Sequence, residues 1–146
     1  MNQEHKKILQ AISELNLALP VMVLDMGNIA LNQTLKTFRD QGYTDETLVK
    51  WANRKRNDKK AGRGILIGQG SGTSGLRGSY RKVSRSALSI SIVNDKVYSG
   101  VHNEGLKAGR GRGFIMPERR MIGDSAVLRR LIGRSIGNRL GKIFTE

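Results

Sequence analysis

The sequence predicts an α+β fold, in which helices come first, a small antiparallel sheet is built on a central hairpin, and a basic amphipathic helix ends the chain. Two patterns carry this prediction. Apolar residues recur at helical spacing near both ends of the chain, whereas between residues 88 and 92 they alternate with serine, as in a half-buried strand. The 146 residues suit a single domain, 1–146, and the 18 glycines indicate long connecting loops.

Residues 1–53 are expected to be helical. A helix over residues 3–18 is predicted by four apolar residues at helical spacing, Ile8, Leu9, Ile12 and Leu15. The stretch Asn16–Pro20 is expected to break it, because proline removes a backbone donor. A second helix is expected from about Val21 to Asp40, with Gly42 as its C-terminal signal.

Thr44 is expected to cap a short third helix. The first turn of this helix would hold Asp45 and Glu46, whose charges suit the positive end of a helix. Leu48 and Trp51 lie three residues apart, which places them on one face for burial.

The second part of the chain alternates between cationic loops and regular elements. Residues 54–79 form a basic, glycine-rich stretch that is expected to be mostly loop. A β-hairpin is predicted over residues 80–104, with a strand at Leu88–Ile92, a turn at Asn94 and Asp95, and a returning strand at Val97–His102. A second basic, glycine-rich loop covers residues 105–116.

The final helix is predicted over residues 124–144, capped by Asp124 or Ser125. Six apolar residues mark one side of it: Leu128, Leu131, Ile132, Ile136, Leu140 and Ile143. Gly133, Gly137 and Gly141 form a bare stripe, and each interior glycine destabilises a helix by up to about 1 kcal/mol relative to alanine. The stripe predicts the close approach of another backbone; the alternative is a frayed tail.

The net charge of +14 is concentrated in the last 96 residues. Residues 1–50 carry five Lys or Arg against six acids, a net charge of −1, whereas residues 51–146 carry 21 against six, a net charge of +15. Such a cationic surface attracts nucleic acid, acidic protein surfaces or anionic membranes. The alternative is a solvated surface that only keeps the protein soluble.

Several functional classes are disfavoured by what the chain lacks. It has no cysteine, which removes disulfides, thiolate catalysis and zinc sites that need sulfur. No apolar run approaches the roughly 18 residues of a membrane span, and the N-terminus lacks the apolar centre of a signal peptide. We therefore expect a soluble, unprocessed protein without membrane contact.

Neither a cofactor, a metal nor an enzymatic activity is expected. Gly70, Gly72 and Gly75 match the pattern GxGxxG, but a strand pattern follows them, whereas the dinucleotide motif needs a helix there. His5 and His102 lie on different elements and lack an evident orienting partner, so His102 is interpreted as satisfying turn backbone groups. The twelve carboxylates are scattered singly.

The cationic part of the chain is compatible with nucleic-acid contact through phosphates. Sequence-neutral duplex binding needs only clustered lysine and arginine, whereas readers of single strands and RNA usually add exposed aromatics for stacking. The chain has seven aromatics, none of them between Lys59 and Ser79, and only Phe114 borders the second loop. Base readout is therefore not indicated.

Three segments carry a family resemblance. The first is Phe38-x-x-Gln41-Gly42 followed by Trp51. The second runs from Ile65-Leu66 through Ser74-Gly75-Leu76-Arg77-x-Ser79-Tyr80. The third and most specific is Tyr98-x-x-Val101-His102-Asn103-x-Gly105, then a Gly/Lys/Arg loop, then Met116-Pro117-x-Arg119 and Gly123-Asp124-Ser125.

In this order, over residues 38–125, the segments resemble the phage virion morphogenesis family, the tail-completion proteins of Mu-like and related tailed phages. The chain departs from the family pattern at Met121, where an aromatic or leucine is usual, and at Asp124, where a leucine commonly precedes the serine. The resemblance implies a structural virion protein for tail completion or head-to-tail joining at the neck. Such proteins form rings around the DNA channel.

The resemblance also implies partners and a location. The partners would be other neck or tail proteins, such as the connector and the tail tube terminator, further copies of the chain on assembly, and duplex DNA without sequence specificity. The protein would be assembled in the bacterial host cytoplasm and reside in the virion. A second hypothesis is a basic nucleic-acid-binding module that coats RNA or DNA without sequence readout.

The candidate site residues fall into two sets. Those expected to face the DNA channel or a neighbouring subunit are Lys107, Arg110 and Arg112, followed by Arg119 and Arg120. Structural roles are implied by the resemblance for Trp51, Gly75, Leu76, Arg77, His102, Asn103, Gly105 and Pro117. Within the third segment only residues 106–113 combine charge with conformational freedom, so they are expected to be the working surface.

Overall fold

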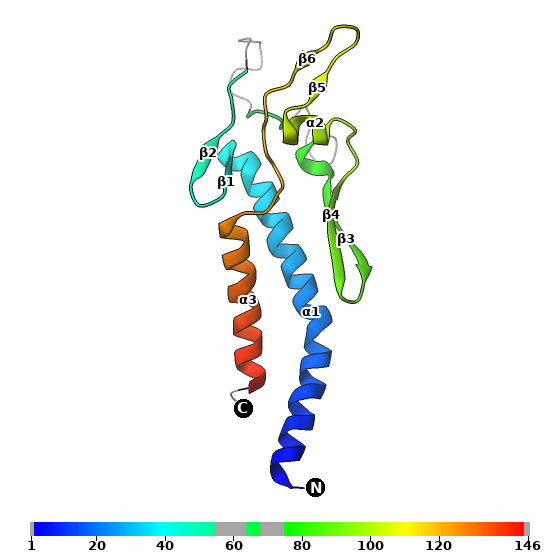
Figure 1. The fold of residues 1–146 in the computed structure, drawn as a ribbon, viewed down its shortest axis with the longest axis vertical. Helices are drawn as coiled ribbons and strands as arrows, with labels where there is room; N and C mark the ends of the chain where they lie inside the picture. Colours follow the sequence, from blue (N-terminus) through cyan, green and yellow to red (C-terminus); the bar gives the residue numbers. More distant parts are fainter. Residues whose placement is uncertain (1, 55–63, 68–74, 145–146) are drawn as a thin grey trace.

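The computed structural model describes residues 2–54, 64–67 and 75–144, and it has the expected α+β class (Figure 1). A long helix, α1 (Gln3–Asp40), runs along most of the length of the molecule, with the C-terminal helix α3 (Ala126–Phe144) beside it. The other elements are β1 (Gly42–Thr44), β2 (Leu48–Lys50), the 3₁₀ turn η1 (Arg77–Ser79), β3 (Tyr80–Ser86), β4 (Ser89–Asn94), α2 (Ser99–Glu104), β5 (Lys107–Ala108) and β6 (Phe114–Ile115). In the described part of the chain the strands form three separate two-stranded antiparallel sheets.

The first two predicted helices are one continuous helix, so the expected break at Asn16–Pro20 is wrong. Proline's fixed φ is itself helical, and the lost hydrogen bond can be outweighed where helix-favouring residues and tertiary contacts continue on both sides. The helix is capped by Asn2, whose side chain accepts a hydrogen bond from the His5 amide at 3.0 Å.

α1 ends at Asp40 through Gln41 rather than through the predicted Gly42. Gln41 adopts the left-handed conformation, with φ of 52°, and its amide donates to Thr37. The Gln41 side chain also accepts from the Ile65 amide and donates to the Phe38 carbonyl. These bonds hold a non-glycine residue in a conformation that usually favours glycine.

The predicted third helix is wrong, because residues 42–50 form the β1–β2 hairpin. Asp45 lies in the turn of this hairpin, and it accepts hydrogen bonds from the first amides of another helix, α3. Its carboxylate accepts from the Ala126 amide at 2.7 Å and its carbonyl accepts from the Val127 amide at 3.2 Å. An acidic residue does sit at a positive helix end, as the composition indicated, but that end belongs to α3, 81 residues away.

The central hairpin exists, but its partner strand precedes Leu88 instead of following it. β4 pairs with β3 in antiparallel register, from Tyr80 opposite Asn94 to Ser86 opposite Ser89. The predicted returning strand, Val97–His102, is wrong, because residues 99–104 form α2. The hairpin packs against α1, where the side chain of Ile90 lies over Gly27.

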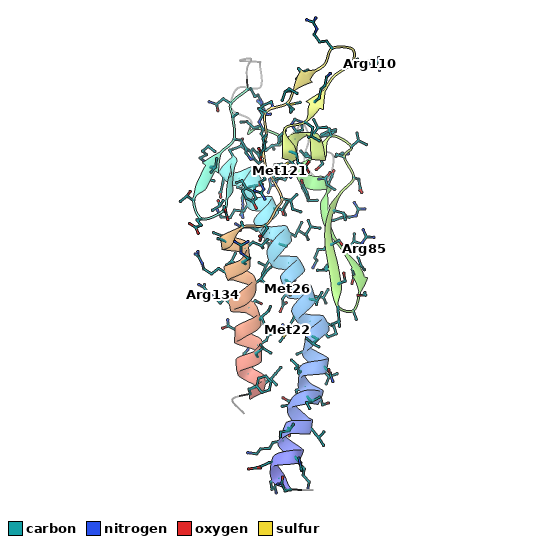
Figure 2. All side chains as sticks on the ribbon, viewed as in Figure 1. Met22, Met26, Arg85, Arg110, Met121 and Arg134 are labelled. Carbon is teal, nitrogen blue, oxygen red and sulfur yellow. The ribbon has the colours of Figure 1, made fainter. Side chains whose placement is uncertain are left out.

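The core lies where α1, β2, η1, β3 and the chain after α2 meet. It consists of five buried side chains, Phe38, Trp51, Leu76, Tyr80 and Met121, with Ile65, Leu66 and Ile92 among the partly buried residues packed against them. The Phe38 ring meets the Trp51 ring edge-on at 5.5 Å and the Tyr80 ring at 6.0 Å. Figure 2 shows Met121 in this region, level with the upper end of α1.

The C-terminal helix is confirmed, and its cap is Ser125, whose hydroxyl accepts from the Leu128 amide at 3.0 Å. α3 is tied to α1 by Arg139, which donates two hydrogen bonds to the Asp25 carboxylate, at 2.8 and 2.6 Å. A Cβ atom added at Gly133, Gly137 or Gly141 would meet no atom of the described chain within 4 Å. Among the described residues, therefore, no atom occupies the space beside this glycine stripe.

By length and composition alone, α1 could cross a membrane, contrary to the expectation that no segment of the chain would. A single helix of this kind near an N-terminus is weak support for a span, because core helices and signal sequences share the same composition. Asp25, within α1, forms the ion pair with Arg139.

Candidate functional site: a cationic arm

The predicted second basic loop is a small hairpin that projects from the end of the molecule opposite the N-terminus (Figure 1). We call residues 106–115 the arm. Within it, β5 and β6 pair with Lys107 opposite Ile115 and Ala108 opposite Phe114. The working surface expected at residues 106–113 is thus largely one side and the tip of an ordered two-stranded ribbon.

Glycine sets the shape of the tip. Gly109, Gly111 and Gly113 have φ values of 90°, 63° and 62°, which L-residues rarely adopt. The Gly113 amide donates to the Arg110 carbonyl at 3.2 Å and closes the turn. A Cβ atom on Gly113 would lie 2.8 Å from the Ala108 carbonyl oxygen, so this position also requires glycine for space.

The arm carries Lys107, Arg110 and Arg112 and no acidic residue. All three cations are exposed, and Figure 2 shows Arg110 at the outer end of the arm. Leu106, Phe114 and Ile115 are exposed as well, so the ribbon presents apolar side chains beside its charges. Cationic and apolar groups together suit contact with phosphates or with a protein surface.

The base of the arm is fixed by hydrogen bonds on both sides. α2 ends at Gly105, which has the left-handed φ of 67°, and its amide donates to the Val101 carbonyl. The Leu106 amide donates to Val101 at 3.1 Å, and the Met116 amide donates to the Leu106 carbonyl at 3.1 Å. Because its base is held in this way, the arm has a defined direction relative to the core.

Asn103 joins α2 to the chain that returns from the arm. Its side-chain oxygen accepts from the Met121 amide at 2.8 Å and from the Ile122 amide at 3.0 Å. The His102 carbonyl accepts from the Arg119 amide at 2.7 Å in the same region. The Asn103 side chain therefore satisfies backbone groups. The same interpretation is wrong for the His102 side chain, whose buried Nδ1 has no hydrogen-bond partner among the described residues; His102 contributes through its backbone.

Arg119 and Arg120 do not join the arm. Arg119 is buried, and its guanidinium donates to the Ala52 carbonyl at 3.2 and 3.0 Å. Burial, and then the charge of Arg54, lower its pKa. Arg120 lies over the Tyr43 ring at 4.6 Å, and its carbonyl accepts from the Trp51 indole at 2.9 Å. Both residues hold the core end of the molecule together.

The remaining motif residues surround the core. Leu76 is buried, and its carbonyl accepts from the Asn94 side chain at 2.9 Å. The Gly75 carbonyl accepts from the Ser79 hydroxyl at 3.0 Å. Arg77 is exposed on η1, and Pro117 is half-buried in the irregular segment that follows β6. The predicted loop 54–79 otherwise falls mostly outside the described residues, as do Ser74 and the first two glycines of GxGxxG.

Two residues with clear roles were not predicted. Asp45 binds the start of α3, and the Tyr43 hydroxyl donates to the Asp124 carbonyl at 2.9 Å. The acidic residue at position 45 was a usable signal, since it indicated a helix end. Nothing in the local pattern indicates which helix.

Among the described residues there is no cluster of three or more His, Cys, Asp or Glu that could hold a metal. Comparisons of the chain with protein-family models, curated proteins and solved structures yield no match. The function is therefore argued from the geometry and from the resemblance of its motifs.

We expect His102 to make stability sensitive to mild acid. Burial, and then the charge of Arg119, lower the pKa of His102 below its ordinary 6.5, and no described residue pairs with its buried Nδ1. The folded state resists taking up the proton, so the free energy of unfolding is fully retained above pH 6.5 and falls as the pH drops towards the lowered pKa.

Urea unfolding over a pH series measures this effect. The His102→Gln variant should lose part of the pH dependence between neutral and mildly acidic conditions, while His5→Gln, at an exposed site on α1, should behave as the wild type. Parallel profiles for the wild type and His102→Gln would contradict the assignment.

Proposed function

We propose that this chain is a structural virion protein of a tailed bacteriophage that completes the tail or joins it to the head. In this proposal it acts without catalysis, through ring assembly and contacts with other neck or tail proteins around the DNA channel. The cationic arm faces the channel or a neighbouring subunit.

One observation carries the proposal: three separate segments that resemble the family meet in one core. Phe38 and Trp51 come from the first segment, and Leu76 and Tyr80 come from the second. Met121 lies in the third segment, at a position where the family usually has an aromatic residue or leucine. The segments are far apart in sequence, so a chance resemblance in each would give no reason for their contact. Within the third segment, the arm projects away from this core (Figure 1).

The arm suits a position next to DNA. A two-stranded ribbon fits the major groove, and lysine and arginine neutralise phosphates without reading sequence. Its base is fixed, so subunits arranged in a ring would point their arms in equivalent directions. This supports a role for Lys107, Arg110 and Arg112. Arg119 is buried, and Arg120, although exposed, lies over the Tyr43 ring away from the arm.

The test is head-to-tail joining in a phage that lacks the gene. Unjoined heads and tails from cells infected with the deletion phage are mixed with purified chain, and joined particles are counted by electron microscopy. Wild-type chain should restore joining, and the triple variant Lys107→Ala, Arg110→Ala, Arg112→Ala should not.

A matched variant removes three exposed cations elsewhere, Arg85, Arg130 and Arg134, and should join normally; Figure 2 shows Arg85 and Arg134 away from the arm. Deletion phage that joins heads and tails as efficiently as the parent would overturn the proposal. Equal losses in both triple variants would show that net charge matters and the arm does not.

The second candidate is a basic module that coats nucleic acid, which the net charge of +14 and the arm favour. It predicts that the isolated chain binds duplex tightly. It also predicts that removing the three arm cations lowers the salt slope by about three times 0.9, or about 2.7. Tight binding of this kind without any effect on joining would favour this candidate over the first.

A further inference from the structure

The end of the molecule opposite the arm is apolar and uncovered. The N-terminal half of α1 extends beyond the β3–β4 hairpin, and its first turns also extend beyond the end of α3 (Figure 1). In the described chain six large hydrophobic side chains are buried, whereas sixteen are exposed, and six of the exposed ones lie on α1. These six are Ile8, Leu9, Ile12, Leu17, Val21 and Leu24.

The chain exposes more surface than a compact protein of its mass, because its helices, hairpin and arm form an elongated molecule (Figure 1). A compact protein of 16.2 kDa exposes about 7,450 Å² by the usual scaling with mass. This chain exposes 10301 Å². The difference of about 2,850 Å² exceeds the roughly 1,600 Å² that two neighbours, at about 800 Å² each, would remove from one subunit.

Six apolar residues in the N-terminal part of α1 form two stripes. The first consists of Ile8, Ile12 and Leu15, and the second of Leu17, Val21 and Leu24; both follow the i, i+4, i+7 spacing of a helix face. At about 100° per residue, the centres of the stripes are about 180° apart around the helix axis. The first stripe lines an open hollow together with Ile143 and Phe144 at the end of α3.

Two stripes on opposite faces of α1 can bind two different neighbouring subunits, one on each side. A two-fold dimer needs one self-complementary patch, whereas a ring needs two different patches, each of which binds the other on the next subunit. A single partner of another kind would leave one of the two stripes uncovered.

Charge favours a second copy of the chain at this end of the molecule. Copies with a net charge of +14 repel one another. Residues 3–31, however, carry Lys6 and Lys7 against Glu4, Glu14 and Asp25, a net charge of −1. The part of α3 beside it adds Arg134, Arg139 and Lys142, which brings the net charge of this end from −1 to +2. Most of the net charge of +14 therefore lies elsewhere, and two copies repel each other less at this end than at the arm.

We propose that the two stripes of α1 are the subunit contacts of a homo-oligomer. The second stripe of one copy packs against the first stripe of the next copy, in the hollow that Phe144 and Ile143 border. This inference rests on the proposed function, which requires a ring. It adds that the two stripes are the surfaces through which neighbouring subunits of that ring bind each other. The arms lie at the other end of each subunit.

Two variants with one disabled stripe each provide the test. Ile8→Gln with Ile12→Gln removes the first stripe, and Leu17→Gln with Leu24→Gln removes the second; glutamine keeps the helix propensity. Mass photometry and sedimentation velocity of purified full-length chains should show oligomers for the wild type and monomers for each variant. A mixture of the two variants should form dimers and nothing larger, because only one complete contact is available.

The control is Leu88→Gln with Val97→Gln, which removes two exposed apolar side chains elsewhere and should leave oligomers intact. Near-ultraviolet circular dichroism of the buried Trp51 checks that each variant folds. A wild type that is monomeric at every concentration, or variants that do not complement each other, would overturn the inference. So would a monomeric wild type that floats with phosphatidylcholine vesicles through the same stripes, since that result assigns α1 to a membrane.

The joining assay separates this inference from the proposed function. Chain that restores joining but never self-associates overturns the stripe contacts alone. Chain that assembles through the stripes but fails to restore joining supports the contacts and overturns the phage role.

Discussion

Replacing Phe38 by alanine should lower the free energy of unfolding by about 3 to 5 kcal/mol, the usual range for a buried phenylalanine. Phe38 is fully buried and packs against both the Trp51 and the Tyr80 rings. The neighbouring rings belong to different elements and cannot close over the cavity together. Urea or thermal unfolding, followed by the signal of Trp51, measures the change.

Phe114→Ala is the matched control, because Phe114 lies on the arm and is largely exposed. Its effect on stability should be small, since surface substitutions usually change it by about 0.5 kcal/mol or less. Equal losses in the two variants would show that the five-residue cluster is not the centre of stability. The three family segments would then lack a common core, and the proposed function would lose its main support.

Replacing Asn103 by leucine should destabilise the protein by about 2 to 4 kcal/mol, because the amides of Met121 and Ile122 lose their shared acceptor. The chain between the arm and α3 would lose its link to α2. Urea unfolding measures the overall loss, and limited proteolysis of the native protein should cut the chain near residues 116–122 faster than in the wild type.

Asn103→Asp separates the hydrogen bonds from packing. The aspartate oxygen can accept from the same two amides, so this variant should retain most of the stability that leucine loses. If the aspartate and leucine variants were equally unstable, the hydrogen bonds of Asn103 would not be what holds the returning chain.

The helices and strands whose own residues carry a clear apolar pattern are predicted correctly from the sequence. The 3.6-residue period identified helical structure before residue 40 and after residue 124, and Ser125 was one of the two predicted caps of α3. The alternation from Leu88 to Ile92 identified β4. In each case an amphipathic pattern or a local hydrogen bond carries the information.

The predictions are wrong where a contact with residues far away in the sequence determines the local structure. Thr44–Trp51 was predicted as a helix because Asp45 and Glu46 suit a helix start, but Asp45 serves α3 from a hairpin turn. The partner of β4 was sought downstream, because the upstream strand β3 is mostly charged and serine and lacks a clear apolar alternation. Of the five predicted contact residues, three share the arm, while Arg119 donates to the Ala52 carbonyl and Arg120 lies over the Tyr43 ring.

The sequence by itself determined the α+β class, the final helix and the concentration of charge at Lys107, Arg110 and Arg112, because periodicity and composition are local properties. Only the tertiary structure decided that residues 106–115 form a ribbon, that Arg119 is buried and that α1 is unbroken with two uncovered apolar stripes. These features depend on which segments meet in space. Strand pairing, burial and remote capping are set by contacts between residues that are far apart in the chain.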